Sequence, residues 1–148
     1  MSVQKVQHNT LEEITISVKL KLAALWASFM FLYVYVDYLH LYMPESLEDM
    51  LSGKVFVFDV SQTFLLVSLV SVTIPALMIF LSVALPAKAN RWTNMILATL
   101  YIPYSLFNLA GEAWIHMMFG AAVEVALLLL IIRYAWKWPR LVLKHEIS

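Results

Sequence analysis

The sequence predicts an all-α integral membrane protein: a four-helix transmembrane bundle that forms a single membrane domain over residues 1–148. Composition is the first reason, because 62% of the 148 residues are hydrophobic, only 14% are charged, and the mean hydropathy is +0.79. A soluble domain is about half apolar and about a quarter charged. The second reason is four apolar stretches, each long enough to cross a bilayer as a helix. The third is the one-sided distribution of Lys and Arg.

The N-terminal segment, residues 1–18, is polar or amphipathic and is predicted to be cytoplasmic or interfacial. Thr10 and Glu13 have the spacing of a capping box, which indicates a helix start. Residues 14–22 instead alternate between apolar and polar side chains, as a strand does. Helix and strand therefore both stay open for this stretch. The first span is predicted over residues 20–43 and ends at a proline.

An outer loop is predicted over residues 44–59, with a short helix that a glycine ends. The second span, residues 60–85, carries small residues at heptad spacing, which let helices approach closely in lipid. Ser68 and Ser71 belong to this polar face. Pro75 lacks an N–H, so it frees the carbonyl of Ser71 and is expected to bend the helix.

The third and fourth spans are predicted over residues 92–110 and 112–136, and a basic turn precedes the third. Residues 137–148 form the predicted cytoplasmic tail. Nine of the ten Lys and Arg residues lie in the N-terminal segment, the basic turn or the end of the chain, and only Lys54 lies in the outer loop. The positive-inside rule therefore predicts that both termini are cytoplasmic.

Ionisable side chains lie inside the predicted spans. An aspartate in a span, such as Asp37, costs about 2.5–3.5 kcal/mol unless a polar group meets it. Helical geometry puts Asp37 and His40 on one face of the first span, His116 at a similar depth, and Glu124 near mid-bilayer. We expect these four residues to form a proton, ion or ligand site, with Glu124 as the proton carrier. The alternative for the two carboxyl groups is a structural hydrogen bond between helices.

Further polar side chains recur at helical spacing and are expected to line a polar cavity that opens outward. They are Tyr33, Ser68, Ser71, Asn94, Tyr101, Asn108 and Glu112. Glu112 has a simpler explanation, because a carboxylate is favourable at the start of a helix. His40 also has a simpler explanation, because it can be an interfacial side chain with one ring nitrogen in water.

A metal site is a more specific alternative to the proton, ion or ligand site. Asp37 and His40, and likewise Glu112 and His116, are carboxylate–histidine pairs of the kind that helix bundles use to hold metal ions. Spacings of three and four residues also occur by chance, so no cofactor is predicted, and a metal-dependent membrane enzyme stays an alternative. The chain has no cysteine, no phosphate-binding glycine loop, no nucleophile elbow and no basic surface suited to nucleic acid.

Several short motifs also resemble a family of small four-span bacterial membrane proteins that is classed as a domain of unknown function. The resemblance covers residues 11–139. The motifs are Leu25-Trp26, Phe29-Met30, Tyr33-x-Tyr35-x-Asp37, Leu41-Tyr42-x-Pro44, Phe80-Leu-Ser82-x-x-Leu85-Pro86 and Asn90-Arg91-Trp92-x-Asn94. It implies a four-helix membrane fold, and a bacterial inner membrane as the location. It implies no activity.

The leading functional hypothesis is a membrane protein that binds or conducts a proton, ion or small polar solute. A structural or regulatory membrane subunit without catalytic activity is the alternative, and the metal-dependent enzyme comes third. The lipid bilayer is the expected partner, and nucleic acid is not. A second copy of the chain is a further possible partner, through an aromatic face opposite Asp37. This aromatic face consists of Phe31, Tyr35, Tyr38 and Tyr42.

Overall fold

The computed structural model describes residues 14–44, 46–55, 58–110 and 114–139. Five helices and one small two-stranded sheet make up this part of the chain. The helices are α1 (Val18–His40), α2 (Ser46–Leu51), α3 (Gln62–Ala84), α4 (Ala87–Phe107) and α5 (Ile115–Trp136). The strands β1 (Lys54–Val55) and β2 (Phe58–Asp59) pair antiparallel, with Lys54 opposite Asp59.

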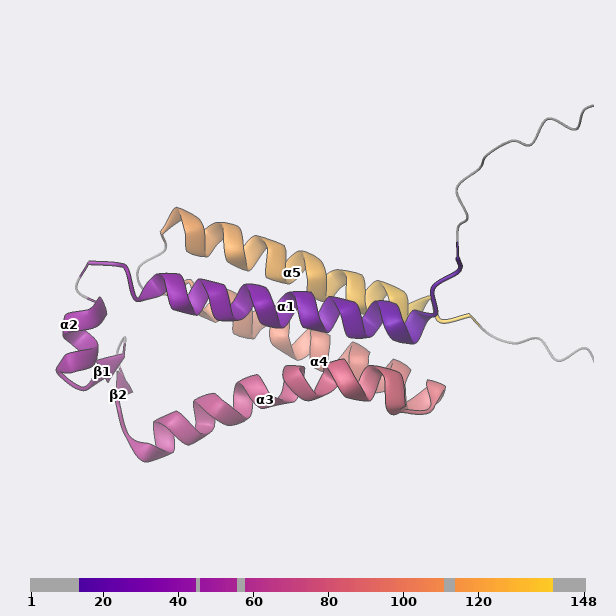
Figure 1. Ribbon diagram of the computed structural model, residues 1–148, viewed down its shortest axis with the longest axis horizontal. Coiled ribbons are helices and arrows are strands. Elements are labelled where there is room, and N and C mark those ends of the chain that lie inside the picture. Colours follow the sequence, from indigo (N-terminus) through magenta and orange to yellow (C-terminus); the bar gives the residue numbers. More distant parts are fainter. Residues whose placement is uncertain (1–13, 45, 56–57, 111–113, 140–148) are drawn as a thin grey trace, which may run out of the picture.

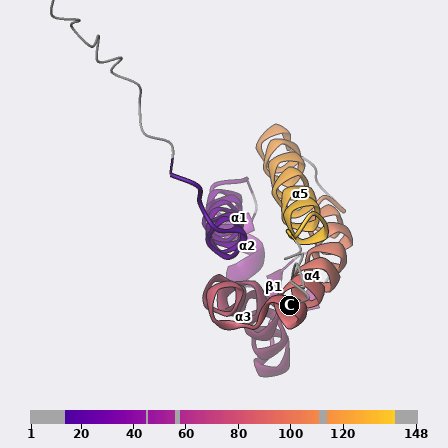
Figure 2. The same ribbon diagram turned by 90° about the vertical axis from the view of Figure 1, so that its right-hand side faces the viewer.

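The four long helices lie side by side (Figures 1 and 2). Helix α1 packs against α3 and α5, and α4 packs against α5. The start of α1, the end of α5 and the α3–α4 turn lie at one end, which we call the terminal end. The sheet and α2 lie at the opposite, hairpin end (Figure 1). The predicted all-helical architecture is confirmed. Within the described residues, α1, α3 and α5 are long and apolar enough to cross a membrane.

The first helix begins at Val18, so helix prevails over strand in the stretch that fits both patterns. Ser17 is the N-cap, and its hydroxyl accepts a hydrogen bond from the Leu20 N–H. Residues 14–17 have no regular secondary structure. The helix satisfies its own backbone groups, which an unpaired strand in an apolar environment does not. The capping box at Thr10 lies outside the described residues.

The prediction of a basic turn before residue 92 is wrong, because α4 already begins at Ala87. Pro86 is the N-cap, and the turn from α3 is reduced to two residues. Lys19 of α1 secures this turn: its Nζ donates to the carbonyl oxygens of Val83 (3.0 Å) and Leu85 (2.7 Å). A cation at the C-terminal end of a helix is favourable, because the last carbonyls lack partners within the helix.

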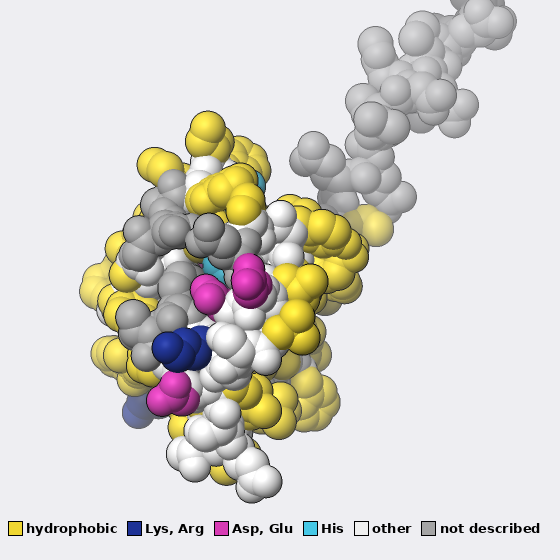
Figure 3. Space-filling model, turned by 90° about the vertical axis from the view of Figure 1, so that its left-hand side faces the viewer, with side chains coloured by type: hydrophobic (Ala, Val, Ile, Leu, Met, Phe, Trp, Pro, Cys, Tyr) yellow, Lys and Arg dark blue, Asp and Glu magenta, His cyan; other side chains and the backbone are white. Residues whose placement is uncertain are grey.

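The predicted outer loop contains α2 and the sheet. Gly53 follows α2 with φ +82°, the left-handed conformation that glycine adopts at helix ends, as the sequence predicted. Ser61 caps α3 by accepting a hydrogen bond from the Phe64 N–H. Acidic side chains gather on the face at the hairpin end, and hydrophobic side chains cover the flanks (Figure 3).

The core is concentrated in the terminal half of the bundle. Its buried residues include Leu22, Trp26, Phe29, Met78, Ala98, Leu128, Ile131 and Ala135. In the hairpin half, α3 diverges from α1 (Figure 1). The divergent turns of α3 expose a broad apolar surface, made of Leu65, Leu66, Val67, Leu69 and Val70, while Phe64 and Ser68 on the remaining side are half-buried. Large exposed apolar surfaces mark contacts with a membrane or with another protein.

Candidate functional site

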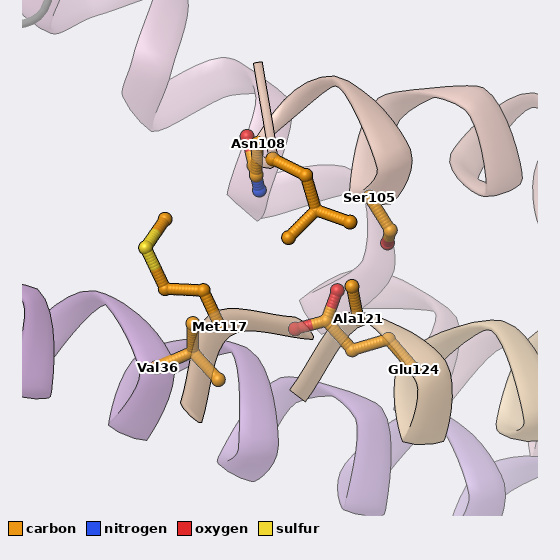
Figure 4. A pocket seen from close by; sticks show the side chains of 7 residues that line it. Val36, Ser105, Asn108, Met117, Ala121 and Glu124 are labelled. Atoms are coloured by element: carbon orange, nitrogen blue, oxygen red, sulfur yellow. The ribbon is translucent and has the colours of Figure 1, made fainter. Parts of the chain in front are cut away.

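Glu124 lies in the middle of α5, and its side chain is only 2% exposed. The carboxyl group points across a small cavity toward α4 (Figure 4). Because side chains lean toward the start of their helix, this group leans toward the hairpin end. Its neighbours accordingly come from the hairpin-side turns of α1 and α4. The cavity is lined by Val36, Ser105, Asn108, Leu109, Met117, Ala121 and Glu124.

The cavity has a volume of about 10 Å³. A cavity needs about 10–15 Å³ on this measure to hold one water molecule. The space beside Glu124 is therefore close to the size of a single water. The cavity volume limits the size of a ligand at this position, because in this conformation no solute larger than water fits next to the carboxyl group.

Two polar groups act electrostatically on Glu124, the hydroxyl of Ser105 and the carboxyl of Asp37. The Ser105 Oγ is fully buried, faces Glu124 (Figure 4) and is the one hydroxyl among the described residues that acts on its carboxyl group as a hydrogen-bonding group, although the two do not meet ideal hydrogen-bond geometry. Neither group is a cation. Among the described residues, the buried carboxyl group of Glu124 thus has no positive partner, which is unusual because burying an unpaired charge is costly.

Gly120, one turn before Glu124, sets how closely α5 approaches α1. A Cβ atom at Gly120 would lie 2.5 Å from the Cγ2 atom of Val36, far inside van der Waals contact. Val36 also lines the cavity beside Glu124. The glycine therefore permits the close packing that forms one wall of the cavity.

Asp37 lies on the surface of α1, although the sequence predicted that it faces the bundle axis. The reason is the divergence of α3, which leaves this side of α1 uncovered. Protein atoms still surround Asp37 at longer range, and it interacts electrostatically with Tyr33 and Glu124. His40 is half-buried at the end of α1.

His116 lies in the first turn of α5, and its ring contacts Trp114 at 6.2 Å between ring centroids. Its Nε2 atom is buried without a hydrogen-bond partner. Within the part of the chain that the structure describes, no three metal-ligating side chains come together. Glu112, the fourth candidate ligand and a predicted lining residue, lies outside the described residues.

Four of the predicted polar residues take part in a hydroxyl cluster where α1, α3 and α4 meet. The Tyr104 hydroxyl lies 3.2 Å from that of Tyr33 and 3.0 Å from that of Ser71. Ser71 also donates to the carbonyl of Ser68 (2.7 Å). The Tyr101 hydroxyl donates to the carbonyl of Ser71. Asn108 lies beside Tyr33 and thereby connects this cluster to the Glu124 cavity.

The hydrogen bond from the Tyr101 hydroxyl to the Ser71 carbonyl explains how helix α3 accommodates Pro75. Proline has no N–H, so the carbonyl of Ser71 lacks its partner within the helix, as the sequence predicted. The hydroxyl of Tyr101, on α4, supplies the missing donor. Helix α3 continues through Pro75 without interruption from Gln62 to Ala84.

Asn94 belongs to a separate amide cluster in the terminal half. Its Oδ1 accepts from the indole Nε1 of Trp26 (2.7 Å) and from the hydroxyl of Ser82 (3.3 Å). Its Nδ2 donates to the Oδ1 of Asn90 (2.6 Å), and the Asn90 Nδ2 donates to the carbonyl of Ser82. The cluster is fully buried and hydrogen-bonded between three helices. The predicted polar lining therefore divides into two clusters and one small cavity.

A family model described as "Family of unknown function (DUF6326)" matches residues 12–144. The chain belongs to this family. The expected membership of an uncharacterised family is thereby confirmed. No curated protein and no solved structure matches the chain.

Four residues that shape the site in this DUF6326 chain were not among the predicted site residues. Tyr104 and Ser105 lie three and four residues after Tyr101, so helical spacing alone could have placed them on the same face. Asn90 is likewise four residues before Asn94. Gly120 lies four residues from both His116 and Glu124, but this spacing does not predict a close approach between helices, which depends on the neighbour as much as on the glycine.

Proposed function

We propose that this chain is an integral membrane protein in which all four long helices cross the bilayer, with both termini in the cytoplasm. Among the described residues, three helices are long and apolar enough to span a membrane. The fourth, α4, has 21 residues and a length of about 31 Å, close to the roughly 30 Å of a hydrocarbon core. Its buried polar residues point toward neighbouring helices, which is the arrangement that lipid favours.

We further propose that the protein binds a proton at Glu124 and exchanges it with the outer side. The observation that carries this proposal is the burial of Glu124 without a cationic partner among the described residues. The neutral acid suits such a site, because it avoids the cost of an unpaired buried charge. A cavity of about 10 Å³ excludes solutes larger than water by size, and it does not exclude a proton.

Access to Glu124 differs between the two ends of the bundle. Toward the hairpin end lies Asp37, which is exposed and interacts electrostatically with Glu124. Toward the terminal end, Leu128 and Ile131 follow Glu124 on α5 and are fully buried in the core with Trp26. In this conformation the proton would therefore enter and leave from the hairpin side, with Asp37 as the outer acceptor.

Infrared spectroscopy tests the binding step. At neutral pH the wild-type protein should show the C=O stretching band of a protonated carboxylic acid, and Glu124→Gln should lack it. Glu48→Gln is the matched control, because Glu48 is an exposed carboxylate on α2. A spectrum in which Glu124→Gln retains the band of the wild type would refute proton binding at this residue.

Proton flux into liposomes tests conduction. A dye inside the vesicles reports acidification after a potential is imposed. Wild type and Glu48→Gln should acidify the vesicles faster than empty liposomes do. Glu124→Gln should fall to the level of empty liposomes, and Asp37→Asn should slow the flux. Equal flux in all four proteins would exclude a conducting role for the two carboxyl groups.

A second candidate is a structural or regulatory subunit that associates with a second copy of itself. The supporting observation is the aromatic face, whose four members are all at least half exposed. Two of them, Tyr38 and Tyr42, are held together by a 2.6 Å hydrogen bond between their hydroxyls. Native mass spectrometry of wild type and Tyr35→Ala tests this alternative: a dimer that Tyr35→Ala disrupts supports it, and a monomeric wild type refutes it.

A further inference from the structure

Charge is distributed unevenly along the bundle. Every described Lys and Arg except Lys54 lies at the terminal end, and no described acidic residue lies there. The terminal cations are Lys19, Lys21, Lys88, Arg91, Arg133 and Lys137. Lys19 and Lys21 already have partners, since Lys19 caps α3 and Lys21 lies 5.5 Å from the ring centroid of Tyr134.

Arg91 is held in an unusual way. Its guanidinium carbon lies 5.9 Å from the ring centroid of Trp92 and 5.8 Å from that of Trp136. The two tryptophans come from different helices, the start of α4 and the last residue of α5, and both are exposed. The Nε atom of Arg91 is buried and makes no hydrogen bond. Aromatic rings, and no described carboxylate, therefore fix this guanidinium.

We propose that Arg91, Trp92 and Trp136 form a site for the phosphate headgroup of an anionic phospholipid. This proposal rests on the proposed insertion into the membrane, and it is independent of proton binding at Glu124. A guanidinium presents a planar fork of N–H donors that matches two oxygens of a phosphate. Contact with two indole rings restricts the Arg91 side chain, so less conformational freedom is lost when the phosphate binds.

The position of the site fits a lipid better than a soluble anion. The site lies where α4 begins and α5 ends, and α5 is long and apolar enough to cross a membrane. Tryptophan is enriched at the level of the lipid headgroups. Lys88 is three residues before Arg91 and Lys137 directly follows Trp136, so both add positive charge nearby. With no described acid at this end, the charge is complementary to an anionic headgroup.

Native mass spectrometry of the detergent-purified protein tests the proposal. The protein is titrated with phosphatidylglycerol and with phosphatidylcholine of the same acyl chains. We expect the wild type to retain one phosphatidylglycerol in preference to phosphatidylcholine. A wild type without this preference would overturn the proposal. Inorganic phosphate is added as a competitor, and displacement of the lipid at low millimolar phosphate would overturn the assignment to a lipid.

Variants distinguish a built site from general surface charge. One cation near an anionic membrane changes affinity by about fivefold. We expect Arg91→Gln and Trp136→Leu each to weaken phosphatidylglycerol binding more than about tenfold, and Lys137→Gln to weaken it no more than about fivefold. Arg91→Lys, which keeps the charge and loses the planar fork, should be clearly weaker than wild type. Equal binding by Arg91→Lys and wild type would overturn the proposal.

Further measurements distinguish a loss of lipid binding from a loss of folding and from a loss of the proposed proton flux. Thermal unfolding in the same detergent identifies variants that bind poorly because they are unfolded, and Lys54→Gln at the hairpin end should bind as wild type does. Proton flux is measured separately with Arg91→Gln. A protein that conducts protons but shows no lipid preference would refute this inference alone.

Discussion

In the terminal half of the bundle, the buried amides of Asn90 and Asn94 are hydrogen-bonded to each other and to residues of α1 and α3. In the hairpin half, the buried carboxyl group of Glu124 faces a cavity and has no cationic partner among the described residues. Helix α3 packs closely on its neighbours in the first region and diverges from them in the second. Polar groups are thus buried in both regions, but those of the terminal half are hydrogen-bonded to neighbouring helices, whereas the carboxyl group in the hairpin half has no described cationic partner.

The difference predicts that the two halves of the bundle differ in stability. Buried polar groups with complete hydrogen bonds fix one arrangement of the helices. Regions with fewer buried contacts open at lower free energy and are where functional motions usually occur. We therefore expect the terminal half to hold the fold and the hairpin half to rearrange. Four substitutions test this comparison, from the largest expected effect to the smallest.

Trp26→Ala should produce the largest loss of stability. Trp26 is fully buried. Its replacement by alanine leaves a cavity and removes the hydrogen bond that the indole N–H donates to Asn94. A Trp→Ala change in a core costs about 3–5 kcal/mol. The free energy of unfolding, measured by denaturant titration in mild detergent, should fall by this amount. Trp92→Ala is the control, because that ring is 51% exposed and should cost less than about 1 kcal/mol. Similar losses in both variants would contradict a terminal core.

Gly120→Ala should have the next largest effect. The new methyl group would collide with Val36, and overpacking of this kind costs about 1–3 kcal/mol. Because Val36 also lines the Glu124 cavity, the proposed proton flux should change as well. Ala122→Ser adds one atom at an exposed position of the same helix and should leave both properties unchanged. If Gly120→Ala is as stable as wild type, α1 and α5 are not in the close contact described.

Tyr104→Phe should have a moderate effect. Its hydroxyl joins Tyr33 on α1 to Ser71 on α3, and the loss of such hydrogen bonds costs about 0.5–1.5 kcal/mol. Hydrogen exchange should become faster in the first turns of α3, because this cluster is where the divergent part of α3 is attached. Tyr35→Phe is the matched control, since the Tyr35 side chain is exposed. Unchanged exchange in Tyr104→Phe would show that the cluster does not restrain α3.

Leu66→Ala should have the smallest effect. Leu66 is 61% exposed in the divergent part of α3, and substitutions at such positions change stability by about 0.5 kcal/mol or less. Leu128→Ala, the same change in the terminal core, should cost about 2–5 kcal/mol. A large loss from Leu66→Ala in detergent would mean that this surface is covered by another part of the protein or by a second copy.

Much of this fold could be predicted from local sequence. Apolar stretches of span length identified α1, α3 and α5, and the missing N–H of Pro75 identified the free carbonyl of Ser71. Spacing of three, four and seven residues also identified Tyr33, Asn94 and Tyr101 as polar groups that face neighbouring helices. These predictions hold because they depend on one helix at a time.

The remaining features depend on how the helices are placed relative to one another. Asp37 shares a face with Tyr33 by spacing, yet it is exposed because α3 turns away from that part of α1. Asn94 and Tyr101 lie on one face of α4, but their partners come from α1 and α3, and the sequence of α4 does not identify those partners. Crossing angles and separations are set by many side chains together, so a single pattern does not reveal them.

The hydrogen bond from Tyr101 to the main chain of Ser71 has a consequence for sequence variation in the family. Its acceptor is a carbonyl that every amino acid carries, so residue 71 is free to change without loss of this bond. The constraint falls instead on the proline that exposes the carbonyl and on the tyrosine that reaches it. In related chains we therefore expect positions 75 and 101 to covary: where the proline is replaced, the tyrosine hydroxyl becomes dispensable.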